Sequence, residues 1–311
     1  MTNRNTTEIT AQIWNDINSK LNHVNIRSRN YINDVITLIS NEMGIDKILS
    51  IILFGSQNSS AHEDTVISDC DLLIIFDNSV TNRNIRNVEK YFMSLEIKHQ
   101  FREFNYTLPK KILGVVQQTT GMFISHFMTQ KKYWQKAEFH KIFHVNEVFT
   151  VFFAPSRIVL SSVIDNSTLL YGEDSRDEVK NQIKIPFYDM IKSILMNLII
   201  AIFSIVITPF SSLNSIKYEL EAVKWALRAS NYYSYEDSKS LEKIIKRFML
   251  FERPRFKKRA EKFYSEFLQL RKNPERDLSF ILRVPFRILK IHVKGLLFKS
   301  IREKKSSKNK Q

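Results

Sequence analysis

Two acidic residues, Asp69 and Asp71, stand directly before the apolar run 72–76. On an extended strand, side chains at i and i+2 project to the same face, so these two carboxylates should lie together while Cys70 points the other way. Mg²⁺ prefers oxygen donors, keeps several waters and is commonly completed by substrate phosphates. The pair therefore predicts a Mg²⁺ or Mn²⁺ site at the end of a strand, with Asp69 and Asp71 as ligands.

A Gly-Ser pair follows an earlier apolar run, 48–54. At Gly55 the backbone can approach a ligand closely, and Ser56 offers an N–H and a hydroxyl, for which phosphate oxygens are natural acceptors. Twelve residues separate Ser56 from Asp69, enough to return the chain to a neighbouring strand. Gly-Ser alone is an ordinary turn and Asp-x-Asp alone is common on surfaces, but together they predict a phosphate-binding site with Gly55 and Ser56 beside the carboxylates.

This combination resembles the signature of the DNA polymerase β nucleotidyltransferase superfamily, and 68–72, Ser-Asp-Cys-Asp-Leu, is similar to its common form. Segments 120–127 and 169–174 are similar to parts of archaeal and bacterial nucleotidyltransferase-domain proteins. The resemblance implies an α/β (α+β) catalytic domain with a small mixed sheet, followed by an all-α helical bundle as in kanamycin nucleotidyltransferase. It also implies Mg²⁺-dependent transfer of a nucleoside monophosphate from a triphosphate such as ATP, with release of pyrophosphate.

The sequence departs from the superfamily at the third carboxylate, which a later strand normally supplies. The expected third strand, 122–128, offers Ser125 and His126 but no acid. Glu103, which alternates with aromatic residues, is the best substitute. Without a third acid, the base that activates the attacking hydroxyl must come from elsewhere, or the enzyme is weakened.

A charged ridge in the helical part offers one source for that base. Lys217, Glu221, Lys224 and Arg228 recur at helical spacing, opposite an apolar face. The resemblance to kanamycin nucleotidyltransferase implies a general base at Glu221 and a phosphate-binding side chain at Lys224. The alternative is a set of surface ion pairs that support the helix.

Apolar spacing places the remaining elements. The expected domains are leading helices in 1–45 packed on a catalytic domain at 46–156, a helical bundle at 157–275, and a basic amphipathic helix and tail at 276–311. Strands are expected at 48–54, 72–76 and 122–128, and helices at 180–207, 214–230, 235–251, 255–270 and 280–299, with Pro285 starting the longer part of the last.

The composition limits the class of protein. With 311 residues and 43% hydrophobic content, the chain can bury a substantial core, which favours an ordered globular protein. A single cysteine, Cys70, excludes an intramolecular disulfide framework and a multi-cysteine metal site. The N-terminal residues lack the apolar run of a signal peptide, so a cytoplasmic location is expected.

The positive charge is concentrated near the C-terminus. Residues 239–311 hold 23 Lys and Arg against 7 Asp and Glu, whereas residues 1–238 hold 24 against 25. Such a gradient would attract a polyanion, with RNA favoured over an acidic membrane surface, unless it is a solvated helical face.

The stretch 194–207 is almost continuously apolar, but a membrane-spanning helix needs about 20 apolar residues. Asn197 and Pro209 limit the run, so a helix inside a bundle is favoured over a transmembrane span. Two rival functions remain beside the nucleotidyltransferase with its open acceptor: a catalytically decayed nucleotide- or RNA-binding protein of the same fold, and a membrane-surface protein.

Overall fold

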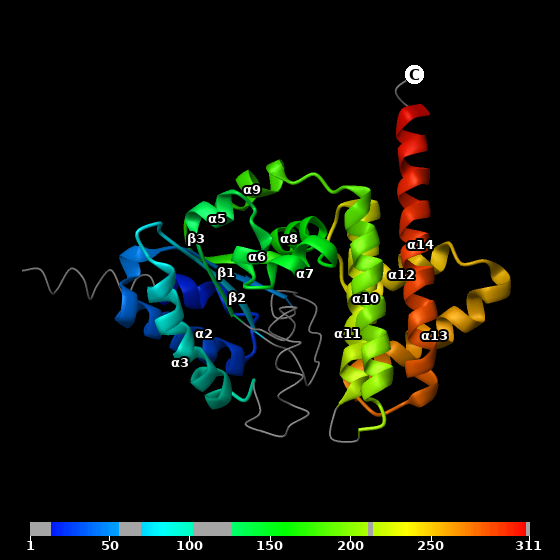
Figure 1. The fold of residues 1–311 in the computed structure, drawn as a ribbon, viewed down its shortest axis with the longest axis horizontal. Helices are drawn as coiled ribbons and strands as arrows, with labels where there is room; N and C mark the ends of the chain where they lie inside the picture. The colour runs from blue at the N-terminus through cyan, green and yellow to red at the C-terminus, as the bar shows by residue number, and fades with distance from the viewer. Residues whose placement is uncertain (1–13, 56–69, 102–125, 211–213, 309–311) are drawn as a thin grey trace, which may run out of the picture. The chain divides into compact units, whose positions relative to one another are not determined.

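The computed structural model describes residues 14–55, 70–101, 126–210 and 214–308, with side chains through residue 304 (Figure 1). The chain divides into two compact units. The first contains the described residues up to 146 together with 166–183, and the second contains 147–165 and the residues from 184 onward.

The first unit is built on a four-stranded mixed sheet. Its strands are β1 (Ile48–Phe54), β2 (Asp71–Phe76), β3 (His126–Gln130) and β4 (Ser167–Gly172), in the order β3-β2-β1-β4. β1 is antiparallel to β2 and β4, whereas β2 and β3 run parallel. The expected small mixed sheet and its first two strands are thus confirmed.

Two features of the sheet differ from the expectation. The described part of the third strand begins at His126 and extends to Gln130, past the expected end at 128, while 122–125 lie outside the described residues. β4 lies inside the region expected to be helical. Residues 166–183, which were expected in the bundle, therefore belong to the first unit. In β4 only Leu170 is buried, so the strand carries little of the apolar alternation that marks a strand in a sequence.

Helices α2 (Ile26–Met43) and α3 (Asn82–Lys98) pack on one face of the sheet. Each begins at a capping side chain: the Asn25 side-chain oxygen Oδ1 accepts from the Ser28 N–H, and the Thr81 hydroxyl accepts from the Asn84 N–H. Their apolar sides form one core with alternate residues of the strands, including Cys70, Leu72, Ile74 and Phe76.

The first unit also contains a helical segment at 14–20, a short 3₁₀ turn and three short helices: η1 (Ile45–Lys47), α5 (Lys131–Gln135), α6 (Phe139–Ile142) and α9 (Arg176–Gln182). Phe143, which ends α6, packs its ring against Phe54 of β1 and Phe127 of β3. These rings lie on the face of the sheet opposite α2 and α3.

The second unit is an all-helical bundle, as expected. Its helices are α7 (Glu147–Phe152), α8 (Ser156–Asp165), α10 (Phe187–Ile207), α11 (Ser215–Tyr235), α12 (Leu241–Leu250), α13 (Pro254–Lys272) and α14 (Leu278–Lys308). Along α11, all of which the structure describes, no residue is exposed. It packs against α10 and α14 and is the central helix of the bundle.

A helix is present where 280–299 was expected to be helical, but Pro285 does not start its longer part. α14 begins at Leu278 and runs through Pro285 as a bundle helix. Proline lacks an N–H and disfavours a helix interior by about 3 kcal/mol. Buried side chains on both sides of it, among them Phe280, Val284 and Ile291, offset this cost by packing against the rest of the bundle.

α10 is long and apolar enough to cross a membrane by length and composition, with mean hydropathy 2.4 over its most apolar window. Polar groups on its buried side are bonded within the bundle, however. Ser193 shares a hydrogen bond of 3.0 Å with His292 of α14, and the Ser204 hydroxyl donates to the Ser215 carbonyl at 2.8 Å. These bonds support the expected assignment of α10 to the bundle.

Candidate active site

Two residues of the predicted motif, Gly55 and Asp71, are described by the structure, and they meet where β1 ends and β2 begins. Phe54 pairs with Asp71, which places Gly55 beside the Asp71 carboxylate. Gly55 has a φ of +79°, and a Cβ atom added to it would lie 1.9 Å from Asp71 Oδ2. A glycine is therefore needed here both for the backbone conformation and for the approach of the carboxylate.

The sheet register sets the direction in which Asp71 projects. Phe54 pairs with Asp71 and Leu73 pairs with Phe127, so Asp71 shares the face of the aromatic cluster formed by Phe54, Phe127 and Phe143. Cys70 is buried in the core on the opposite face, as predicted. Asp69 and Ser56 lie outside the described residues, and their places beside Asp71 and Gly55 remain a prediction from strand alternation.

The Gly55 backbone is also contacted by the residue that precedes β4. The Asn166 side-chain amide donates a hydrogen bond of 3.5 Å to the Gly55 carbonyl. Three chain segments thus converge at this edge of the sheet: the end of β1, the start of β2 and the entry to β4. Only the first two were recognisable in the sequence.

Substitution of Gly55 by alanine is expected to lower the free energy of unfolding by about 1–3 kcal/mol, because it strains the backbone and displaces the Asp71 carboxylate. Urea unfolding measures the loss. Gly44→Ala is the matched control: Gly44 has a φ of +85°, but its added Cβ meets only the side chain of Asp46. Both variants should lose stability, while Gly55→Ala alone should also lose triphosphate binding. Equal binding by the two variants would contradict the role of this junction.

No third carboxylate joins Asp71 from the described part of β3, whose residues are His126 to Gln130. The acid nearest β3 is Glu96 of α3, whose Oε1 lies 2.9 Å from His126 Nδ1 in a buried pair. This pair lies on the opposite face of the sheet, against Phe92. The sequence analysis missed it, although Glu96 follows Val88 and Phe92 at a spacing of four that marks the buried side of α3. Glu103 lies outside the described residues.

Glu221 and Lys224 of α11 form an ion pair whose side chains are 21% and 17% exposed. The pair is therefore partly buried, and both the catalytic role and the alternative of ion pairs that support the helix stay predictions. Burial raises the pKa of Glu221, but the charges of Lys224, Arg271 and Arg228 outweigh it and hold that pKa below its usual range. Burial lowers the pKa of Lys224 despite its anionic partner. With three cations around one carboxylate, the cluster favours an additional anion.

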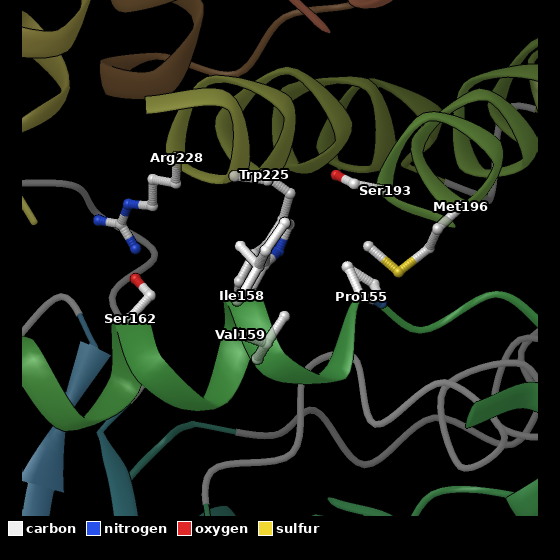
Figure 2. A pocket seen from close by; sticks show the side chains of 9 residues that line it. Pro155, Ile158, Val159, Ser162, Ser193, Met196, Trp225 and Arg228 are labelled. Atoms are coloured by element: carbon white, nitrogen blue, oxygen red, sulfur yellow. The ribbon is translucent and has the colours of Figure 1, made fainter. Parts of the chain in front are cut away.

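A small pocket lies beside this cluster, between α8, α10 and α11 (Figure 2). Pro155, Ile158 and Val159 of the α8 segment face Trp225 and Met196 across it, and Figure 2 shows the Arg228 side chain directed toward Ser162. Its volume of about 10 Å³ admits roughly one water molecule. The pocket is therefore too small for a nucleotide.

Glu219 is an ionisable residue that the sequence analysis missed. It is fully buried, and both its carboxylate oxygens lack a hydrogen-bond partner among the described residues. Burial raises the pKa of Glu219 to about 9. The nearby Ser204 hydroxyl lowers that pKa only in part, because the Ser204 hydroxyl donates its hydrogen to the Ser215 carbonyl. The signal was present in the sequence, because Glu219 occupies the apolar stripe of α11 between Ile216 and Val223.

Replacing Glu219 with glutamine is expected to stabilise the protein at neutral and alkaline pH. The folded-state pKa of about 9 exceeds the usual 4.5, so the folded protein binds the extra proton and its free energy of unfolding falls as pH rises between these values. Glutamine cannot ionise, so the variant should gain up to about 3 kcal/mol at pH 7. Thermal unfolding from pH 5 to 9 measures this. Glu261→Gln, at an exposed site on α13, should keep the wild-type pH dependence, and an unchanged slope in Glu219→Gln would contradict the assignment.

The donor chemistry at the β1–β2 junction fits a divalent cation. Asp71 offers carboxylate oxygens at a strand end, close against the backbone of Gly55. Among the described residues, no three His, Cys, Asp or Glu side chains gather as a metal site, and Asp69 lies outside them.

Comparison with known proteins places the fold. No protein-family model and no curated protein sequence matches the chain. Among solved structures, the spectinomycin adenyltransferase AAD(9) from Enterococcus faecialis, crystallised with ATP and spectinomycin, matches with a TM-score of 0.52 and 9% sequence identity. The alignment covers 86% of this chain and 98% of that one.

The chain shares its fold with an adenyltransferase. The mixed sheet followed by a helical bundle is the arrangement that it shares with the adenyltransferase. At 9% identity the likeness covers architecture and carries no residue roles.

Proposed function

We propose that this protein transfers a nucleoside monophosphate from a nucleoside triphosphate to an acceptor hydroxyl and releases pyrophosphate. The observation that carries the proposal is the junction of Gly55 and Asp71, which brings a carboxylate directly against a glycine backbone in a fold shared with an adenyltransferase. The solved neighbour was crystallised with ATP, which makes ATP the first donor to test.

In the proposed site, Asp71 and Asp69 hold Mg²⁺, and Gly55 and Ser56 receive the triphosphate through backbone N–H groups and the serine hydroxyl. When bound, the metal would stabilise charge on the attacking and leaving oxygens of the phosphoryl group. Gly55 contributes by leaving room for the Asp71 carboxylate, and Asp71 contributes a fixed negative charge that orients the cation.

Glu221 is the proposed base, and Lys224 is the proposed phosphate ligand. The lowered pKa of Glu221 keeps its carboxylate ionised at neutral pH, so the carboxylate can accept a proton from the acceptor hydroxyl. Lys224, Arg228 and Arg271 supply the excess positive charge that a triphosphate or pyrophosphate would neutralise.

The proposal is tested by incubating the purified full chain with each of the four α-labelled triphosphates, Mg²⁺ or Mn²⁺, and a panel of acceptors. Because the solved neighbour is a spectinomycin adenyltransferase, the panel starts with spectinomycin and continues with RNA, proteins and other hydroxylated small molecules. A labelled acceptor formed together with pyrophosphate supports the proposal. Tight triphosphate binding without product from any acceptor would favour the rival, a binding protein that has lost catalysis.

A further inference from the structure

The bundle carries two exposed apolar stripes on neighbouring helices. The α10 stripe consists of Ile191, Leu195, Ile199, Ile202 and Val206, which are 38% to 62% exposed. The α14 stripe consists of Leu282, Phe286, Leu289, Val293, Leu297 and Ile301, which are 41% to 70% exposed. Single exposed apolar residues are common on proteins, but two continuous rows require an explanation.

The two stripes form one surface. α10 and α14 lie side by side in opposite directions: Ser193 bonds His292, while an added Cβ on Gly295 would meet Met190 (Figure 1). The sides of these helices that face α11 are marked by Ser204, which donates to Ser215, and by Gly295, whose carbonyl accepts from Ser234.

Successive residues of a helix are rotated by about 100° around its axis. On this basis the α10 stripe is centred roughly half a turn from Ser204, and the α14 stripe roughly half a turn from Gly295, so both stripes face away from α11. The pair of helices makes a patch about 25 Å long and 20 Å wide, on the order of 500 Å², which is within the range where the largest apolar patch of a protein is often functional.

Basic side chains border the α14 stripe. α13 packs beside α14 through an ion pair of 2.8 Å between Glu266 and Arg283 and a hydrogen bond from Arg287 to the Arg259 carbonyl. The outer side of α13 exposes Arg255, Lys257, Lys258, Arg259 and Lys262, with Glu261 as the acid among them. Among the described side chains of α10 and α14, Glu303 is the one exposed carboxylate.

We propose that the α10 and α14 stripes, with the basic outer side of α13, dock this protein onto an anionic lipid bilayer. An apolar face bordered by Lys and Arg matches the headgroup boundary, where acyl chains accept the apolar side chains and anionic headgroups neutralise the cations. A second copy of the chain would bring like charges together at the same border. The helices lie on the bilayer and do not cross it, because Ser193 and Ser204 are committed to bonds within the bundle.

The test uses the full chain and vesicles of phosphatidylcholine with or without phosphatidylglycerol. Wild type should sediment with the anionic vesicles at least about tenfold more strongly than with neutral ones, and added salt should weaken the binding. Ile202→Ser combined with Leu282→Ser, at exposed sites, should reduce binding at least about tenfold. Lys257→Gln combined with Lys258→Gln should do the same.

Matched controls remove equivalent groups from α3 in the first unit. Tyr91→Ser with Met93→Ser takes away exposed apolar side chains, and Arg83→Gln with Arg86→Gln takes away exposed charges; both should bind vesicles like wild type. Circular dichroism checks that every variant is folded.

The absence of sedimentation with anionic vesicles would overturn the proposal. A second result would also overturn it: the protein is a dimer, and the combined Ile202→Ser and Leu282→Ser changes dissociate that dimer but leave vesicle binding intact. Salt-sensitive RNA binding without vesicle binding would return the basic border to the nucleic-acid hypothesis. None of these results depends on nucleotide transfer, so the docking surface and the proposed enzyme fail or succeed separately.

Discussion

Replacing Asp71 with asparagine is expected to reduce nucleotide transfer to background, a loss of at least about 10³-fold, or 4 kcal/mol of transition-state stabilisation. Asparagine keeps the size of the side chain and its place against Gly55 but removes the charge that holds the cation. The β1–β2 pairing does not depend on that charge, so the fold should be retained. Asp69→Asn should have the same effect.

Transfer of label from the triphosphate measures the rate, and Mn²⁺ paramagnetic resonance measures metal binding in the presence of triphosphate. Asp77→Asn is the matched control, since Asp77 directly follows the far end of β2 and bonds the Ser79 N–H. It should transfer nucleotide at the wild-type rate. Wild-type rates in both Asp69→Asn and Asp71→Asn would refute the assignment of the site.

Replacing Glu221 with glutamine is expected to slow transfer by about 10² to 10⁴ while changing triphosphate affinity by much less, because a general base acts on the rate. The pKa of Glu221 lies below the usual 4.5, so the ionised base persists as pH falls through the neutral range. The rate that depends on it should therefore decline only in the acidic range below 4.5. Rapid-quench kinetics from pH 4 to 8 would measure both effects.

Glu219→Gln is the control on the same helix, since Glu219 is uncharged at neutral pH and its replacement removes no charge. Glu103→Gln tests the other candidate acid. A strong loss in Glu103→Gln with a normal rate in Glu221→Gln would assign the base to Glu103 and return the Glu221–Lys224 pair to a structural role.

The sequence predicted the parts of the fold whose signals are local. The apolar runs that became β1 and β2 are bounded by turn residues, and the alternation of Cys70 and Asp71 followed from strand geometry alone. The bundle helices α11 and α13 were also predictable, because each keeps an apolar side at helical spacing.

The remainder depended on tertiary contacts that no window of sequence contains. β4 is an edge strand with a single buried residue, and it becomes a strand by pairing with β1. α14 passes through Pro285 because packing outweighs the local preference to break. The convergence of Asn166 on Gly55 joins residues 111 positions apart. Of the predicted site, Gly55 with Asp71 and Glu221 with Lys224 are each brought together by the structure.

The most direct test of the account is a crystal structure of the full chain with Mn²⁺ and an ATP analogue that cannot be cleaved between the α- and β-phosphates. We expect an anomalous manganese peak at bonding distance from carboxylate oxygens of Asp69 and Asp71, with the phosphates against Gly55 and Ser56. A nucleotide bound elsewhere, or a metal that Asp71 does not contact, would contradict it.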